Sequence, residues 1–286
     1  MSHAYAFGGC VMTPLLTSAR VLTMRRFSPK LVFRALAAAA VTLMPTVPVT
    51  LDLLTFGAGN RLRQPRLRVI TAGTPLPQPA AHQFKTISGI TARSLYGTTE
   101  TGIIAVTPPD FDAPTGCVGR PMHGVDVMIE PAPDATELGT GVGRVYVRSS
   151  SLMAGYVADG LLDTSALAAG WFRTGDLGRL DGSGMLHLLG RETDVINVFG
   201  MKVIPNEVEE VIAAVAEVAE VKVYAGQRSN SQYVKAAIVG KGDLDLAAIR
   251  AHCKKHLVYY KRPATIHVLA RLPRTASGKV ICTQLP

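Results

Sequence analysis

The segments LRVITAG (residues 67–73) and SLYGTTETG (residues 94–102) decide the fold of this chain. Each contains a short strand-like run that reaches a glycine, and a helix-compatible stretch lies between them. Apolar strands that alternate with helices predict a mainly parallel sheet, in which ligand loops sit at the carboxyl ends of the strands. Gly73 and Gly97 both fall at such ends, so we expect a ligand-binding loop at each.

The character of the sequence changes twice further along the chain. Between about residues 103 and 190, short runs such as VDVMIE and RVYVRSS alternate with Gly, Pro and Asp turns, which predicts a β-rich subdomain. The last ninety or so residues carry helices and strands with apolar residues at regular spacing, which predicts a small α+β unit. We therefore expect an α/β plus α+β fold, with a large domain over residues 1–192 and a small domain over residues 193–286.

Composition limits the classes of protein that the chain can represent. With 286 residues, 48% of them hydrophobic, it should be globular, and its net charge of +9 favours an anionic partner such as nucleic acid, a membrane surface or a nucleotide phosphate. The basic residues are spread out, with a loose group at 61–68, so we expect a solvated surface and no nucleic-acid partner.

Two further observations concern the cellular compartment. Residues 35–51 lack charges, but Pro45 and Pro48 interrupt them, so they predict buried core and no transmembrane segment. The first residues lack a basic stretch ahead of an apolar one, and the four cysteines form no CxxC pair. These features favour a cytoplasmic protein without a disulfide framework or a zinc site.

Four polar, glycine-containing segments interrupt the apolar sequence and suggest phosphate or nucleotide chemistry. In SLYGTTETG, the Thr98 and Thr99 hydroxyls can donate to phosphate oxygens, Glu100 can hold a divalent cation, and Tyr96 can cover a purine. In WFRTGDLG, Asp176 can accept both hydroxyls of a ribose. An ordinary polar turn is an equal alternative for the first segment, and an Asx turn is the alternative for the second.

The other two segments each present one cation. Arg191 opens GRETDVINVFG and could bind ribose or phosphate oxygens, although a structural ion pair is the competing role. Lys279 lies in PRTASGKV and could supply positive charge to a reaction, although a lysine there is usually a solvated surface charge. SGK is not a Walker A loop, because Pro273 stands where the first glycine is required.

In their order and spacing, these segments resemble the adenylate-forming (AMP-binding) superfamily of acyl-CoA synthetases, adenylation domains and luciferases. AGTPLP is similar to the adenine-side loop of that family, SLYGTTETG to its phosphate and magnesium motif, and WFRTGDLG to its ribose motif. GRETDVINVFGMKVIPNEVE resembles its hinge motif, PRTASGKV its catalytic lysine loop, and SHAYAFGG its His-plus-aromatic segment. The resemblance covers nearly the whole chain.

The resemblance implies a two-step reaction, in which ATP and Mg²⁺ convert a fatty or aryl carboxylic acid into an acyl-adenylate. The thiol of CoA, or of the phosphopantetheine on a carrier protein, then takes the acyl group. The small domain would be a mobile lid that rotates between the two steps. The resemblance also implies a role for each candidate residue. Adenine would bind at Gly73, Thr74, Pro75 and Tyr96, and phosphate and Mg²⁺ at Gly97, Thr98, Thr99 and Glu100. Ribose would bind at Asp176 and Arg191, Lys279 would act in adenylation, the thiol tunnel would lie near Gly200 and Lys202, and the acyl pocket would lie at His3 and Tyr5.

Three departures from the family pattern shape the expected function. No Ser/Thr/Gly-rich phosphate loop is present. Thr193 stands at the usually charged hinge position, and Asn197 stands where lysine is common. No Asp follows the His segment where amino-acid-activating members hold an ammonium group, which favours a plain carboxylic acid as substrate. We therefore expect a partial large domain, in an incomplete fragment or one half of a split ligase that needs an N-terminal complementing fragment. The alternative is a non-catalytic remnant that binds nucleotide or a carrier protein. The presence of Glu100, Asp176, Arg191 and Lys279 argues against a chain that has lost its catalytic function.

Overall fold

The structure is a computed structural model that describes all residues except 1–3, 56–63, 65, 132–137, 229–230 and 276–278. The chain forms two compact units. The first unit comprises Met1–Met128, Tyr146–Thr174 and Leu180–Leu188, and the second comprises Ile129–Val145, Gly175–Arg179 and Leu189–Pro286. The domain boundary that we expected between residues 192 and 193 stays a prediction.

A parallel sheet forms the centre of the first unit. Its strands are β1 (Leu43–Thr46), β2 (Arg68–Thr71) and β3 (Arg93–Thr98), and each pairs in parallel with the next. β4 (Gly102–Val106) returns antiparallel to β3, and β5 (Cys117–Pro121) pairs with β4. The carboxyl ends of β1, β2 and β3 therefore lie at the same edge of the sheet, where ligand loops are expected.

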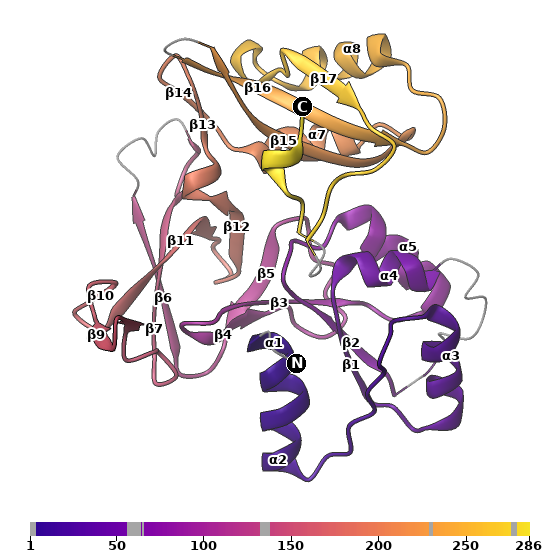
Figure 1. Ribbon diagram of the computed structural model, residues 1–286, viewed down its shortest axis with the longest axis vertical. Coiled ribbons are helices and arrows are strands. Elements are labelled where there is room, and N and C mark those ends of the chain that lie inside the picture. Colours follow the sequence, from indigo (N-terminus) through magenta and orange to yellow (C-terminus); the bar gives the residue numbers. More distant parts are fainter. Residues whose placement is uncertain (1–3, 56–63, 65, 132–137, 229–230, 276–278) are drawn as a thin grey trace. The chain divides into compact units, whose positions relative to one another are not determined.

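Helices cover this sheet and supply most of its core. They are α3 (Pro29–Ala38), α4 (Pro48–Thr55) and α5 (Gln78–Ser88), which Figure 1 shows beside β1 and β2. Their apolar faces meet the buried side of β2, with Phe84, Leu51 and Leu54 fully enclosed. The chain before them forms α1 (Ala4–Phe7), the π-helix η1 (Gly8–Met12) and α2 (Thr13–Thr17).

The prediction that residues 35–51 are buried core is wrong in part. Leu36, Pro48 and Leu51 are buried, but residues 37–40 and Leu43 are exposed. The segment ends one helix, forms the short strand β1 and begins another helix, so only one face of each element reaches the core. Absence of charge was therefore a poor measure of burial here.

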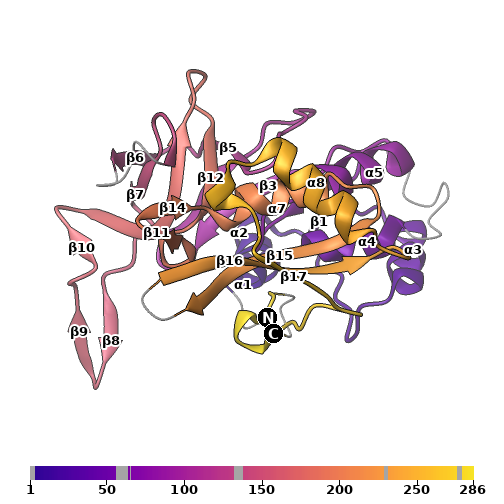
Figure 2. The ribbon, with the colours of Figure 1, turned by 90° about the horizontal axis from the view of Figure 1, so that it is seen from above.

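The β-rich part that follows comprises β6 (Val125–Pro131), β7 (Gly143–Ser149), β8 (Tyr156–Ala158), β9 (Leu161–Asp163), β10 (Leu167–Ala168), β11 (Trp171–Leu180) and β12 (Leu186–Arg191). β12 pairs with β5, and the hydrogen-bonded order continues through β11 and β7 to β6. The division between the two units falls within β6, β7, β11 and β12. β8 and β9 pair only with each other in the described residues and form a thin projecting hairpin (Figure 2).

The C-terminal part of the second unit is a compact α+β arrangement. Its sheet has the order β15-β16-β17, in which β15 and β16 are antiparallel and β17 is parallel to β16. Buried apolar residues of α7 and α8 pack against this sheet, among them Val208, Ile212 and Ile249. The elements are η3 (Glu192–Asp194), β13 (Ile196–Val198), β14 (Met201–Val203), α7 (Pro205–Ala213), β15 (Val218–Arg228), β16 (Ser231–Gly240), α8 (Leu246–His256), η4 (Tyr259–Lys261), β17 (Thr265–Val268) and η5 (Cys282–Gln284).

The expected fold class, α/β followed by a small α+β domain, is confirmed. The helices that we predicted in the last ninety or so residues are present as α7 and α8, and Asp245 caps α8 by accepting from the backbone N–H groups of Ala247 and Ala248. Among the helices that the structure describes, none combines the length and the hydropathy needed to cross a bilayer.

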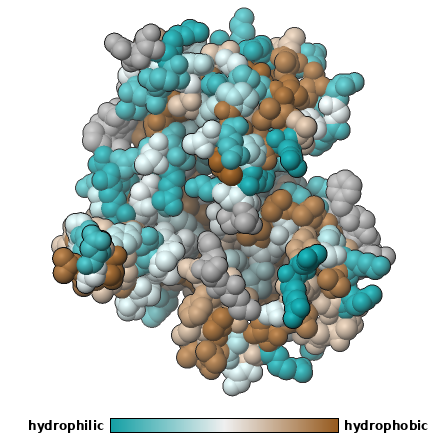
Figure 3. Space-filling model, viewed as in Figure 1, coloured by the Kyte–Doolittle hydropathy of each residue, from teal (hydrophilic) through white to brown (hydrophobic). Residues whose placement is uncertain are grey.

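Hydrophobic side chains also reach the surface of the first unit. They gather over α2, where Leu15 and Leu16 are exposed, and over the β8–β9 hairpin, where Val157 and Leu161 are exposed (Figure 3). The hairpin residues therefore contribute little to the core of the unit.

Candidate functional site

The turn that joins β3 to β4 holds the predicted phosphate and magnesium residues. Thr98 pairs with Gly102 across the hairpin, so Thr99, Glu100 and Thr101 form its tip. The Oγ1 atoms of Thr98 and Thr101 lie 3.0 Å apart and form a hydrogen bond across the turn. Thr99 is exposed and Glu100 is half-buried, so both can meet a ligand that approaches from solvent.

Close backbone packing explains the glycine before this turn. A Cβ atom on Gly97 would lie 2.4 Å from the carbonyl oxygen of Gly102, which is closer than real Cβ atoms come to backbone. Gly102 has a φ of +72°, a conformation that glycine adopts with little strain. The two glycines therefore allow β3 and β4 to approach closely and fix the position of residues 99–101.

A segment that the sequence analysis missed holds this turn from outside the hairpin. The Tyr156 hydroxyl donates to Oε1 of Glu100 at 2.9 Å, and the backbone N–H of Met153 donates to the Glu100 carbonyl at 2.7 Å. The Ser151 hydroxyl donates to the carbonyl of Thr101 at 2.7 Å. Partial burial and the neighbouring Glu100 carboxylate raise the pKa of Tyr156, so the phenol keeps its proton. Contacts across fifty residues leave no local signal in the sequence.

The predicted adenine loop lies beside the same edge of the sheet. Gly73, Thr74 and Pro75 follow the end of β2 and are exposed, and Gly73 has a φ of +93°. Because β2 pairs in parallel with β3, this loop and the end of β3 lie at neighbouring carboxyl ends. Tyr96, which we expected over the purine, lies in β3 with only 9% of its surface exposed.

The residues predicted for the acyl pocket are described only in part. His3 lies outside the described residues. The Tyr5 hydroxyl donates to the carbonyl of Ile70 in β2 at 3.0 Å, and burial raises the pKa of Tyr5 to about 12. Tyr5 is therefore a neutral, hydrogen-bonded side chain held against the parallel sheet.

The two predicted ribose residues form an ion pair in the second unit. The Arg191 Nε lies 2.9 Å from Oδ1 of Asp176, and the Asp176 side chain is 9% exposed while that of Arg191 is 52% exposed. Asp176 follows Gly175, which has a φ of +76°, and a Cβ there would lie 3.5 Å from Nη1 of Arg191. The adjacent strands β11 and β12 thus present a carboxylate and a guanidinium side by side.

Further ion pairs fix the chain just after Arg191. Arg144 contacts Glu192 at 2.9 Å and Glu130 at 3.6 Å. The side chain of Thr193, at the predicted hinge, donates to Asp194 at 3.3 Å. The short helix η3 is therefore tied to β7 and β6 by one arginine, a tie that the sequence analysis did not predict.

The turn between β13 and β14 carries the residues predicted for the thiol tunnel. Asn197 accepts a hydrogen bond from the Gly200 N–H at 2.7 Å, so it caps the turn at the position where the family often has lysine. Phe199 is 84% exposed and has a φ of +52°, and Gly200 has a φ of +93°. Lys202 follows on β14, half-buried and paired in register with Asn197.

Lys279 lies on a closed loop near the end of the chain. Its backbone N–H donates to the Thr275 hydroxyl at 3.1 Å, and its carbonyl accepts from the Thr275 N–H at 2.8 Å. Arg274 pairs with Glu220 of β15 and anchors one side of the loop. Residues 276–278 lie outside the described residues. The Lys279 residue itself is exposed.

The donor set around Glu100 fits magnesium. The described residues contain no group of three or more His, Cys, Asp or Glu side chains that could hold a metal ion by themselves. Mg²⁺ usually binds through one or two carboxylates together with substrate phosphates. A single carboxylate beside threonine hydroxyls is therefore the arrangement that a magnesium–nucleotide complex needs.

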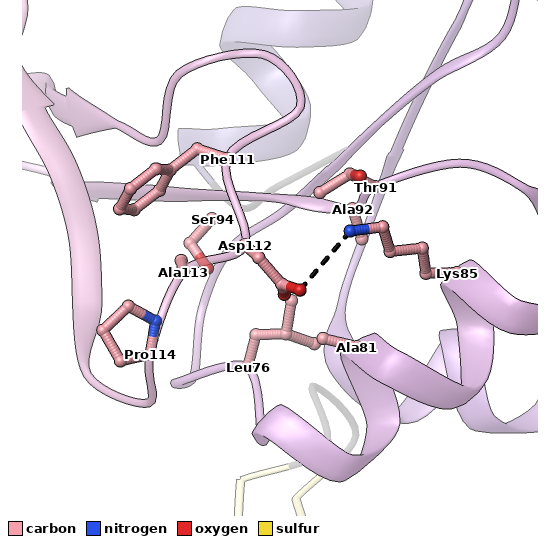
Figure 4. A pocket seen from close by; sticks show the side chains of 10 residues that line it. All are labelled: Leu76, Ala81, Lys85, Thr91, Ala92, Ser94, Phe111, Asp112, Ala113 and Pro114. Atoms are coloured by element: carbon pink, nitrogen blue, oxygen red, sulfur yellow. Dashed lines mark hydrogen bonds and ion pairs between the residues drawn. The ribbon is translucent and has the colours of Figure 1, made fainter.

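A separate pocket in the first unit lies between α5 and the loop before β5 (Figure 4). Lys85 of α5 approaches Asp112 at 3.4 Å, and His82 approaches the same carboxylate at 3.2 Å. Leu76, Phe111 and Pro114 form apolar parts of its wall. Its lining residues, all in the described part of the chain, include none of the individually predicted site residues, although Leu76 and Ser94 belong to the AGTPLP and SLYGTTETG segments.

The predicted residues thus form two groups with different placements. Gly73, Thr74, Pro75, Tyr96, Gly97, Thr98, Thr99 and Glu100 lie on β3 or on the loops at the carboxyl ends of β2 and β3, in the first unit. Asp176, Arg191, Lys202 and Lys279 lie in the second unit, where the structure pairs Asp176 with Arg191.

Two family models match parts of the chain that carry predicted site residues. The model of the family described as AMP-binding enzyme matches residues 1–157, and that of the AMP-binding enzyme C-terminal domain matches residues 207–279. The chain belongs to the AMP-binding enzyme family.

Curated relatives are acyl- and aryl-CoA ligases. The chain is 28% identical over 278 residues to 2-succinylbenzoate–CoA ligase of Lactococcus lactis, covering 96% of this chain and 58% of that protein. It is 30% identical over 220 residues to long-chain-fatty-acid–CoA ligase of Yersinia pestis, covering 76% of this chain and 39% of that protein. The chain thus spans about half the length of the curated relatives that it matches.

Solved structures of adenylate-forming enzymes share the fold. ATP-bound MatB from Rhodopseudomonas palustris matches with a TM-score of 0.85 and 26% identity, covering 96% of this chain and 56% of that one. O-succinylbenzoate coenzyme A synthetase from Bacillus subtilis, in complex with ATP and magnesium, matches with a TM-score of 0.85 and 28% identity, covering 99% and 59%. The resemblance inferred from the sequence motifs is confirmed.

Proposed function

We propose that this chain takes part in the ATP-dependent activation of a carboxylic acid, fatty or aryl, through an acyl-adenylate, with transfer to the thiol of CoA. The Asp176–Arg191 pair carries the proposal, because a buried carboxylate beside an exposed guanidinium suits the two hydroxyls of a ribose. Family membership and the CoA ligases among its relatives support the reaction class.

Each predicted residue has a defined task in this reaction. Thr98 and Thr99 donate to phosphate oxygens, and Gly73, Thr74 and Pro75 flank the adenine, with Tyr96 supporting them from β3. Glu100 holds the magnesium ion, which neutralises phosphate charge. Lys279 supplies positive charge where negative charge develops.

The bonds change in two steps. An oxygen of the substrate carboxylate forms a bond to the α-phosphorus of ATP, and the bond from that phosphorus to pyrophosphate breaks. The thiolate of CoA then attacks the acyl carbon, and AMP leaves with the bonding electrons. Gly200 and Lys202 line the path of the thiol in this proposal, and Tyr5 lies near the acyl group, a role that the sequence also predicts for His3.

Three finer points belong to the same proposal. Residues 193–286 act as a lid that brings Lys279 to the nucleotide in the first step and the β13–β14 turn in the second. The phosphopantetheine of a carrier protein is an alternative thiol. The chain spans about half the length of its curated relatives, and in this proposal a polypeptide that supplies the unmatched part would support adenylation.

Nucleotide binding tests the proposal most directly. Calorimetry should show that AMP binds the chain and that Asp176→Ala abolishes this binding. Asp126→Ala is the matched control, because Asp126 pairs with Arg148 at 2.8 Å on the surface, where the carboxylate is 59% exposed. Absence of AMP binding to the unmodified chain would contradict the proposal.

The chemical step needs a separate assay. Carboxylate-dependent pyrophosphate exchange should be weak for the chain alone and should rise when a polypeptide supplying the unmatched part of a relative is added. If AMP binds but neither form catalyses exchange with a panel of fatty and aryl acids, the chain is a non-catalytic nucleotide-binding protein.

A further inference from the structure

The Glu100 turn has an external support, which is formed by residues 151–156. Three hydrogen bonds link the two segments: from Tyr156 to the Glu100 carboxylate at 2.9 Å, from Met153 to the Glu100 carbonyl at 2.7 Å, and from Ser151 to the Thr101 carbonyl at 2.7 Å. Two of these bonds hold the backbone of the turn, and the third reaches the carboxylate itself. All three lie within the first unit.

We propose that Tyr156 is a positioning residue for Glu100, whose carboxylate it holds in the orientation that binds the magnesium ion of the nucleotide. This inference rests on the proposed function. Tyr156 itself does not bind the metal. It acts on the conformation of the Glu100 side chain at the tip of the β3–β4 hairpin.

The start of the β8–β9 hairpin fixes the place of Tyr156. Tyr156 pairs in register with Asp163, and a Cβ on the preceding Gly155 would lie 2.6 Å from the carbonyl oxygen of Asp163. Gly155 has a φ of +154°, which glycine adopts readily. The tyrosine therefore projects from a defined backbone position.

The chemistry of a carboxylate allows both contacts at once. A carboxylate has two oxygens with about four lone-pair sites, so the hydrogen bond at Oε1 leaves acceptor capacity for a cation. Partners that hydrogen-bond to metal-binding carboxylates orient them, and loss of such a partner lowers metal affinity by about 10- to 100-fold. Tyr156 has the geometry of such a partner.

A purely structural role for Tyr156 predicts a different outcome. The tyrosine is 44% exposed, and its hairpin neighbours Val157, Leu161 and Leu162 are exposed by 75%, 74% and 57%. The ring thus adds little buried area to the first unit. If Tyr156 has a structural role, its replacement should lower the free energy of unfolding. If it has a positioning role, its replacement should reduce the gain in nucleotide affinity that magnesium provides.

Calorimetry of ATP binding with and without Mg²⁺ separates these roles. We expect Tyr156→Phe to reduce the magnesium-dependent gain in ATP affinity about tenfold while leaving the metal-free affinity unchanged. Tyr224→Phe is the matched control, because its hydroxyl donates to the backbone oxygen of Pro286 at 2.7 Å, and it should keep the full gain. In a Glu100→Gln background, Tyr156→Phe should have no additional effect.

Each result decides between specific statements. If the unmodified chain gains affinity from Mg²⁺ and Tyr156→Phe gains as much, the inference about Tyr156 is wrong and the proposed function stands. If Tyr156→Phe lowers the magnesium-dependent gain in ATP affinity as much in the Glu100→Gln background as in the unmodified chain, Tyr156 acts by another route and the inference is wrong. If the unmodified chain binds no ATP with or without Mg²⁺, the proposed function is wrong and the inference falls with it.

Discussion

The guanidinium of Arg191 lies 2.9 Å from the carboxylate of Asp176, and only the carboxylate is withdrawn from solvent, with 9% of its side chain exposed against 52% for the arginine. Arg191 is thus a counter-charge for a buried anion, and it still presents part of its surface to a ligand. The two roles considered for Arg191, a structural ion pair and a ribose contact, are compatible in this geometry.

Removal of Arg191 should destabilise the protein more than removal of a comparable surface arginine. Arg191→Ala leaves the buried carboxylate without this partner, and we expect a loss of about 1–3 kcal/mol in the free energy of unfolding. Arg148→Ala breaks an ion pair in which both side chains are more than half exposed and a contact with the Trp171 ring, and it should lose about 1 kcal/mol. Urea denaturation measures both, and equal losses would contradict the burial argument.

Replacement of Gly97 should disturb the Glu100 turn. In Gly97→Ala the new methyl group would lie 2.4 Å from the Gly102 carbonyl oxygen, so β3 and β4 must separate, and we expect a loss of about 1–3 kcal/mol in unfolding free energy. Gly182→Ala is the control, because a Cβ atom there would meet no described atom within 4 Å beyond its neighbours in the chain. If each variant loses no more than about 0.5 kcal/mol of unfolding free energy, the turn tolerates the methyl group and the prediction is wrong.

The buried phenol of Tyr5 should make stability depend on alkaline pH. Its pKa is raised to about 12 in the folded protein, against about 10 in the unfolded chain, so the neutral form is favoured on folding. The resulting stabilisation is fully present below pH 10 and is lost as the pH rises through 12. Relative to Tyr5→Phe, the unmodified chain should therefore lose unfolding free energy between pH 10 and 12. Urea denaturation measures this quantity. If the difference in unfolding free energy between the unmodified chain and Tyr5→Phe stays constant over this pH range, the prediction is wrong.

Loss of Lys279 should affect chemistry more than binding. We expect Lys279→Ala to lower adenylation by about 100- to 1,000-fold, because charge that stabilises the transition state is removed, and to leave AMP affinity nearly unchanged. Lys241→Ala is a suitable control, since that exposed lysine donates to the Ala216 carbonyl at 2.8 Å. Pyrophosphate exchange and calorimetry measure the two quantities. A parallel loss of AMP affinity would instead assign Lys279 to nucleotide binding.

Local sequence patterns predicted the elements that a local cause determines. The regular spacing of apolar residues near the end of the chain predicted helices, and in one of them, α7, Val208 and Ile212 are fully buried. The strand-like runs before Gly73 and Gly97 predicted β2 and β3, because buried parallel strands are continuously apolar. The segments expected to bind ligand were found from their Gly, Thr and charged residues, and their catalytic roles stay predictions.

Contacts between distant segments could not be predicted in the same way. The hydrogen bond from Tyr156 to Glu100 joins residues 56 positions apart, and its geometry depends on the β8–β9 hairpin. The exposure of Ala37 and Ala38 depends on which face of α3 meets the sheet, which an uncharged sequence does not reveal. The pairing of Arg191 with Asp176 depends on the order of β11 and β12 in the sheet.

The turn between β13 and β14 holds Phe199 in the left-handed region, although glycine or asparagine would occupy that conformation with less strain. The protein thus retains about 1 kcal/mol of avoidable conformational energy at a position where the aromatic ring faces water. Directed evolution for heat resistance alone should replace the aromatic residue, and directed evolution that also demands turnover should keep it only when the ring contributes to catalysis.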